Sequence, residues 1–245
     1  KNKEKNKMAK TALSETQSEE TALTSASGDI IEGSPTASLA VAPGAGLVGD
    51  FDASDISFPK LQIAQGVGAL SETYKKGTIV LDGEFEISNG EDEVEITVCR
   101  IGKMFEENIE WDSGEIPRIF NSKAEVLEAD PEATFVWADG TPASWKPIAD
   151  ALVCIKGEDP TNFPFEFGGN NYAFAVWRIK GTAYKHAAVP IFTAAKMYYR
   201  DGINVGSFML STQKVKAGNN VVHAPKLRKG ARHDRKFVEW LKDFS

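Results

Sequence analysis

Cysteine and histidine are scarce in this sequence, and their spacing excludes the common disulfide and metal sites. The two cysteines, Cys99 and Cys154, belong to no CxxC pair, and two thiols alone build neither a disulfide framework nor a zinc site. Each lies in an apolar alternating segment, which favours two small buried side chains and a reducing cytoplasmic setting. His186, His223 and His233 follow no metal-binding spacing. We expect no metal and no cofactor.

Long hydrophobic runs and catalytic motifs are also missing. No apolar run approaches the roughly 18 residues that span a membrane, and the start of the chain lacks the pattern of a signal peptide. We therefore expect a cytoplasmic protein with no membrane partner. The seven residues before Met8 are left out of the fold prediction. No phosphate-binding glycine loop, GxSxG or HExxH motif is present, so we predict that the protein is not an enzyme.

Aromatic residues are absent from the first 49 positions, which are rich in Ser, Thr, Ala, Gly and Glu. Such a segment buries too little apolar surface to offset the loss of chain entropy. We predict a disordered arm over 1–49 and a single β-rich nucleic-acid-binding domain over 50–245, with a short C-terminal helix.

Charge is divided unevenly along the chain. The net charge is -7, yet residues 176–245 carry 14 Lys and Arg against 4 Asp and Glu. The first 175 residues carry 14 cations against 31 acids. A chain divided in this way presents one positive and one negative field, and its positive third is suited to a polyanion.

Short strands dominate the apolar pattern. Residues 93–101 alternate apolar and polar side chains, and DG, GGNN and AGNN sequences join neighbouring strands as hairpins. Short helices are expected within 122–133, from Pro190 to Gly202, and over 232–244. The predicted fold class is mainly β, a barrel of OB-like, Greek-key type with one or two short helices and the disordered N-terminal arm.

Aromatic and basic residues gather in the same third of the chain. Cations neutralise the phosphates of single-stranded DNA, and flat rings stack on its unpaired bases. Trp177, Tyr184 and Tyr198 are candidate stacking platforms, although each is also compatible with a place in the core. The candidate nucleic-acid-binding residues are Trp177, Arg178, Lys180, Tyr184, Lys185, Lys196, Tyr198, Arg200, Lys214 and Lys216.

Two regions resemble a known family. They are FPKLQIAQGVGALSETYKKGTIVLDG at 58–83, and WRIKGTAYKHA at 177–187 followed by GSFMLSTQKVKAGNNVVHAPKL at 206–227. They are similar to phage-encoded single-stranded-DNA-binding proteins. The resemblance implies an OB-like barrel in the host cytoplasm that coats DNA during replication and recombination, with replication or recombination proteins as partners. RNA as a ligand and a homodimer both remain open.

One feature departs from that family. Many of its members end in a long acidic tail, whereas this chain ends in EWLKDFS. Recruitment of partners by such a tail is therefore in doubt. Our hypothesis is that the acidic N-terminal arm takes over this role and competes with DNA.

Two other functions remain open from the sequence. A charge-divided β protein with a flexible arm also suits a virion, assembly or interaction protein. A metal-dependent nuclease would need converging carboxylates, such as Asp50, Asp52 and Asp55 with Glu84 or Glu86.

Overall fold

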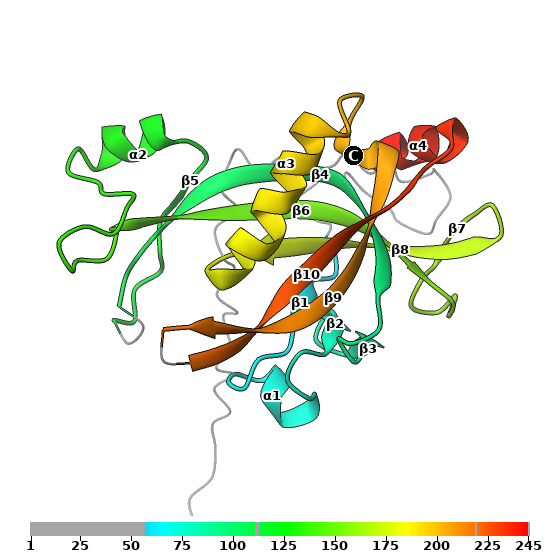
Figure 1. Cartoon of the computed structure of the whole chain (residues 1–245), viewed down its shortest axis with the longest axis horizontal. Coiled ribbons are helices and arrows are strands. Elements are labelled where there is room, and N and C mark those ends of the chain that lie inside the picture. The colour runs from blue at the N-terminus through cyan, green and yellow to red at the C-terminus, as the bar shows by residue number, and fades with distance from the viewer. Residues whose placement is uncertain (1–56, 111–112, 219, 245) are drawn as a thin grey trace, which may run out of the picture. The chain divides into compact units, whose positions relative to one another are not determined.

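The computed structural model describes residues 57–110, 113–218 and 220–244 (Figure 1). The predicted arm over 1–49, and Asp50, Asp52 and Asp55, lie outside these residues. The strands are β1 (Leu61–Ile63), β2 (Ile79–Leu81), β3 (Phe85–Ser88), β4 (Val94–Glu107), β5 (Ile119–Phe120), β6 (Trp145–Gly157), β7 (Phe165–Phe167), β8 (Asn170–Ile179), β9 (Gly206–Ala217) and β10 (Asn220–Arg232). The helices are α1 (Leu70–Thr73), α2 (Lys123–Ala129), η2 (Tyr184–Ala188), α3 (Val189–Met197), η3 (Ile203–Val205), α4 (Arg235–Leu241) and η4 (Lys242–Phe244).

The predicted mainly-β class is confirmed, and the large sheet follows Greek-key order. Its strands pair in the order β10-β9-β4-β6-β8-β7, with β5 paired to β4. The neighbours are antiparallel throughout. Strands β4, β6 and β8 lie in succession, and the chain then returns through η2, α3 and η3 to place β9 on the other side of β4. This arrangement of four strands is a Greek key.

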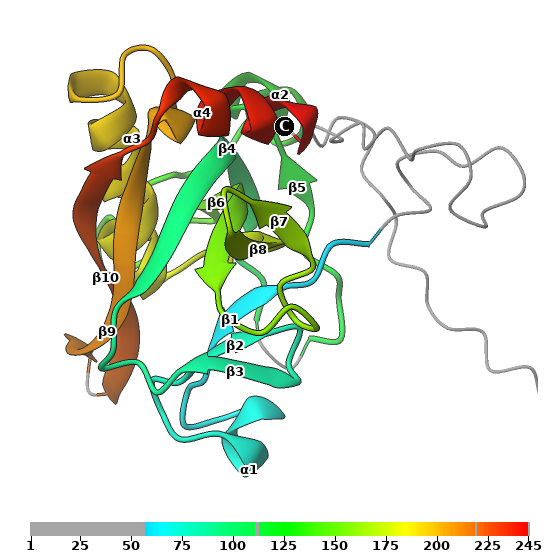
Figure 2. The same ribbon diagram turned by 90° about the vertical axis from the view of Figure 1, so that its right-hand side faces the viewer.

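The sheet does not close into the barrel that the sequence predicted. A separate sheet of β1, β2 and β3 lies between its two ends (Figure 2). At one end, Val176 of β8 donates its backbone N–H to the carbonyl of Pro59 at 2.8 Å. At the other end, the side chain of Gln65 donates to the carbonyl of His223 in β10 at 2.7 Å. The small sheet therefore bridges an open large sheet through short contacts rather than through a continuous strand ladder.

Both faces of the large sheet are covered. One face carries Ile96, Val153, Ala175 and Trp177 and packs against the small sheet, η2 and α3. The opposite face carries the second set of alternating side chains and packs against α4 through an aromatic cluster. Because the side chains of a strand point alternately to the two faces, the alternation in β8 supplies both layers.

The predicted turns and helices are largely confirmed. Asp82 and Gly83 have positive φ angles of 53° and 76° and form the DG turn between β2 and β3. The GGNN and AGNN sequences join β7 to β8 and β9 to β10. The predicted start of α3 near Pro190 is confirmed, whereas its predicted end at Gly202 is wrong. A π-helical turn, η2, precedes it, and α3 ends at Met197 because Tyr198 leaves helical geometry well before Gly202.

Candidate nucleic-acid interface

Trp177 does not offer a stacking surface in this fold, which corrects the sequence prediction. Its side chain is only 3% exposed and belongs to the main core. Tyr184 is half-buried against the same core, and its ring lies 6.5 Å from that of Phe192. The core interpretation therefore holds for Trp177 and, in large part, for Tyr184.

Two predicted phosphate-binding cations already have carboxylate partners. Arg178 forms a bidentate ion pair with Asp150, the residue opposite it on β6, with N–O distances of 2.9 and 2.6 Å. Lys180 donates to Glu106 of β4 at 3.2 Å. These pairs neutralise the charge along β8, so the predicted positive field does not extend over this strand.

The remaining predicted cations follow α3 and the β9–β10 hairpin. Lys185, Lys196 and Arg200 are exposed on the connection from β8 to β9, while Lys214 and Lys216 are exposed near the end of β9. Figure 1 shows α3 running beside this hairpin, and Figure 2 agrees. None of these five forms an ion pair with a carboxylate within the residues that the structure describes.

An open groove lies between α3 and the hairpin. Its volume is about 320 Å³, and its floor is apolar, with Phe208 and Leu227 from the hairpin and Ala194 from α3. Lys185 and Lys229 stand on its two walls. The groove therefore combines an apolar surface with a cation on each side. It is lined by Lys185, Val189, Pro190, Thr193, Ala194, Tyr198, Phe208, Leu227 and Lys229.

Tyr198 stands at the end of the groove and is 54% exposed. The ammonium of Lys229 lies 3.6 Å from the centre of its ring, a cation–π contact. Arg232 donates to the backbone carbonyl of Tyr198 at 3.1 Å. Two cations from β10 thus hold this tyrosine where the helix ends. Of the three predicted stacking platforms, Tyr198 is the one whose ring is most accessible.

The positive field continues toward the end of the hairpin. Burial lowers the pKa of His223, and the neighbouring Lys214 and Lys76 lower that pKa further by repulsion. Lys76 belongs to the segment before β2, so a separate part of the chain adds charge here. The opposite face of the hairpin differs, because Arg228 is paired with Glu93 at 2.5 and 3.1 Å. The positive charges without a carboxylate partner therefore gather on the face of the hairpin that lies toward α3.

We call this surface the basic face and define it by Lys185, Lys196, Tyr198, Arg200, Lys214, Lys216, Lys229 and Arg232. Residues 181–232 contain nine Lys and Arg and a single acid, Asp201. Lys229 and Arg232 belong to the basic third of the chain, but the candidate residues chosen from the sequence did not include them. The AGNN turn could have indicated the position of Lys229 from the sequence. A two-residue loop there fixes the hairpin register and sets Lys229 opposite Phe208.

The remaining observations do not add a second site. Within the described ranges, no three His, Cys, Asp or Glu residues gather where they could hold a metal ion. No helix in the same ranges is long and apolar enough to cross a membrane. Comparison with family models, curated proteins and solved structures found no match to this chain.

Proposed function

We propose that this protein binds single-stranded DNA on the basic face and does no chemistry on it. Seven cations on this face have no carboxylate partner within the described residues. They follow one helix and one hairpin beside an apolar groove and an exposed tyrosine. Single-stranded DNA needs cations for its phosphates and an exposed flat ring for its unstacked bases, and the two must lie side by side. The unpaired cations along the groove are the observation that carries the proposal.

Electrostatic capture is the first step of the proposed mechanism. Lys185 and Lys229 flank the groove, so phosphates passing along it meet a cation on either side. A base would then lie on the ring of Tyr198, where stacking contributes about 1–3 kcal/mol per base. The resemblance to phage-encoded single-stranded-DNA-binding proteins supports the same assignment, with a place in replication or recombination. Single-stranded RNA also has a phosphate backbone and unstacked bases, and it remains an alternative ligand.

The reporter for the test follows from where the tryptophans lie. Trp145 and Trp177 are buried, Trp240 belongs to the α4 cluster, and Trp137 lies outside the groove. None of these four tryptophans lines the groove, so the anisotropy of a labelled oligo-dT is the more direct reporter of binding there. We expect saturable binding that weakens steeply between about 50 mM and about 200 mM salt.

Two variants locate the binding site. Tyr198→Ala should weaken oligo-dT binding by about 1–3 kcal/mol while leaving thermal stability nearly unchanged, because the ring is exposed. Trp177→Ala should instead lower thermal stability first, because it opens a cavity in the core. Absence of binding at low salt, or equal binding by the Tyr198→Ala variant, would contradict the proposal.

A further inference from the structure

An acidic lobe projects beyond the ends of β4 and β6. It comprises the described residues 108–110 and 113–144, including β5 and α2, and these carry seven acids against two cations. Figure 1 shows it on the left, with α2 at its top. Val126 of α2 packs with Phe105 of β4 and Trp145 of β6 in a small core at the base of the lobe. The lobe is therefore a negatively charged projection that packs onto the ends of β4 and β6, with a charge opposite to that of the basic face.

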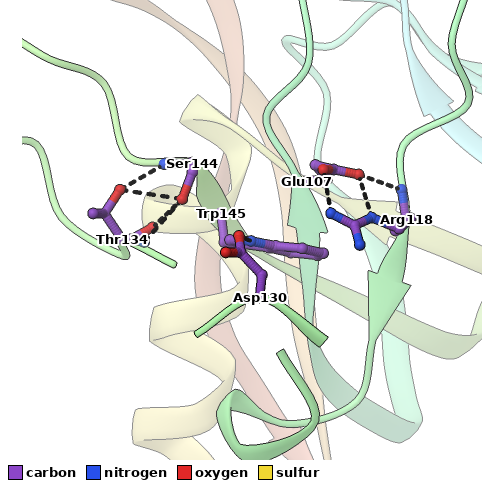
Figure 3. A network of polar contacts seen from close by, with 6 residues as sticks. All are labelled: Glu107, Arg118, Asp130, Thr134, Ser144 and Trp145. Atoms are coloured by element: carbon purple, nitrogen blue, oxygen red, sulfur yellow. Dashed lines mark hydrogen bonds and ion pairs between the residues drawn. The ribbon is translucent and has the colours of Figure 1, made fainter. Parts of the chain in front are cut away.

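Polar contacts tie this lobe together and to the ends of β4 and β6, and Figure 3 shows them. The buried indole of Trp145 donates to Asp130 at 2.9 Å. Thr134 and Ser144 exchange backbone-to-side-chain hydrogen bonds at 2.8 and 2.9 Å, which ties the two ends of the projecting loop together. Arg118 binds Glu107 through two bonds of 2.8 and 2.6 Å and fixes β5 to the end of β4.

The tip of the lobe exposes large apolar side chains. Val136 is 71% and Trp137 is 69% exposed. The turn that follows is closed by two backbone hydrogen bonds between Ala138 and Thr141, at 3.2 and 2.8 Å. An indole held in water on a well-fixed loop is the kind of anchor that dominates protein interfaces. Glu132 and Asp139 lie nearby in the sequence and are exposed, so a partner for this tip should be basic around an apolar socket.

The chain itself contains such a socket. The groove on the basic face is apolar at its floor, measures about 320 Å³ and is flanked by Lys185 and Lys229. Its lining includes no residue of the lobe, so the lobe of the same copy does not fill it. We propose that Trp137 and Val136 of one copy dock into the basic groove of a second copy. The two surfaces differ, so the contact is heterologous, and a pair of copies keeps one free lobe and one free groove to which further copies can add.

Self-association and DNA binding then compete, because both use the same groove. The inference shares this surface with the proposed function but does not depend on it. The complex should weaken as salt rises, because opposite charges meet across its rim. Competition would keep the basic face covered until a nucleic acid displaces the lobe.

Sedimentation velocity of the full chain tests this inference. The wild-type chain should form concentration-dependent oligomers at low salt. Trp137→Ala should weaken the association by about thirtyfold, the loss typical of a buried anchor. Val67→Ala, a matched change at an apolar side chain exposed elsewhere, should have no effect. Thermal unfolding of each variant checks that the fold is intact.

A mixing experiment separates this geometry from other modes of association. Lys229→Glu impairs the groove and Trp137→Ala impairs the lobe, so each variant alone should be largely monomeric at concentrations where the wild-type chain forms oligomers. Mixed together, they retain one working pair of surfaces and should form a 1:1 dimer that grows no further. Wild-type chain that stays monomeric at all concentrations, or a mixture that stays monomeric, would overturn the inference.

Oligo-dT then distinguishes failure of this inference from failure of the proposed function. Oligomers that depend on Trp137 and persist with excess oligo-dT would support self-association and contradict DNA binding in the groove. Oligo-dT binding by a wild-type chain that never self-associates would support DNA binding and contradict the docking of the lobe.

Discussion

Removing two groove cations should change the salt dependence of DNA binding by a calculable amount. Lys185→Gln and Lys229→Gln together neutralise the two walls of the groove. For single strands the logarithm of affinity falls with the logarithm of salt concentration with a slope of about −0.7 per phosphate contact. If all seven cations of the basic face contact phosphates, the slope is about −4.9 in the wild-type chain and about −3.5 in the double variant.

These slopes predict distinct measurements. Between about 50 mM and about 200 mM salt, wild-type affinity should fall by about 900-fold and that of the double variant by about 130-fold. At about 0.1 M salt, losing two contacts should weaken binding by roughly 25-fold. Anisotropy titrations with labelled oligo-dT at four or more salt concentrations measure both quantities.

The control removes the same charge from the paired side. Arg178→Gln and Lys180→Gln together change the net charge equally, but Asp150 and Glu106 already neutralise these cations. This variant should keep nearly the wild-type slope. An unchanged slope in the groove variant, or an equal change in both double variants, would refute the assignment of the basic face.

Three further predictions concern other parts of the chain. Burial raises the pKa of Cys99 to about 12 and that of Cys154 well above its usual value; both thiols should therefore resist iodoacetamide in the folded protein and react after unfolding, as mass spectrometry would measure. Burial lowers the pKa of His233, which lies 2.7 Å from the hydroxyl of Thr97 and against Phe237. The unfolded chain then binds the proton more readily, so stability should fall as pH drops below about 6.5, and His233→Gln should reduce this dependence in thermal unfolding at pH 5 to 7. Deletion of residues 8–49 should raise oligo-dT affinity if the acidic arm competes for the basic face, and unchanged affinity would remove that hypothesis.

The sequence predicted the strands well because alternation and turn residues lie within each strand or hairpin. The alternation of β8 places Trp177 and Ala175 on one face and Phe174 on the other, and the DG, GGNN and AGNN sequences located the hairpins. The exposure of those faces was not predictable in the same way. The second face of β8 is buried because α4 packs on it, and that contact depends on residues more than fifty positions away.

The candidate site was only partly predictable for the same physical reason. Charge counting found the basic third of the chain, but it cannot tell a paired cation from an unpaired one. Arg178 meets Asp150 through the β6–β8 register, and Lys180 reaches Glu106 on β4. Both contacts depend on strand pairing. The exposed tip of the lobe gave no distinct sequence signal. The apolar residues Val136 and Trp137 in a loop have the same pattern as a short segment of the core.

Photochemical cross-linking of oligo-dT to the full chain, followed by peptide mass spectrometry, tests most directly whether single-stranded DNA lies on the basic face. Cross-links should concentrate on peptides that contain Tyr198 and on the β10 peptides around Lys229, and they should disappear at high salt. Cross-links confined to the lobe around Trp137, or spread evenly over the surface, would contradict DNA binding in the groove.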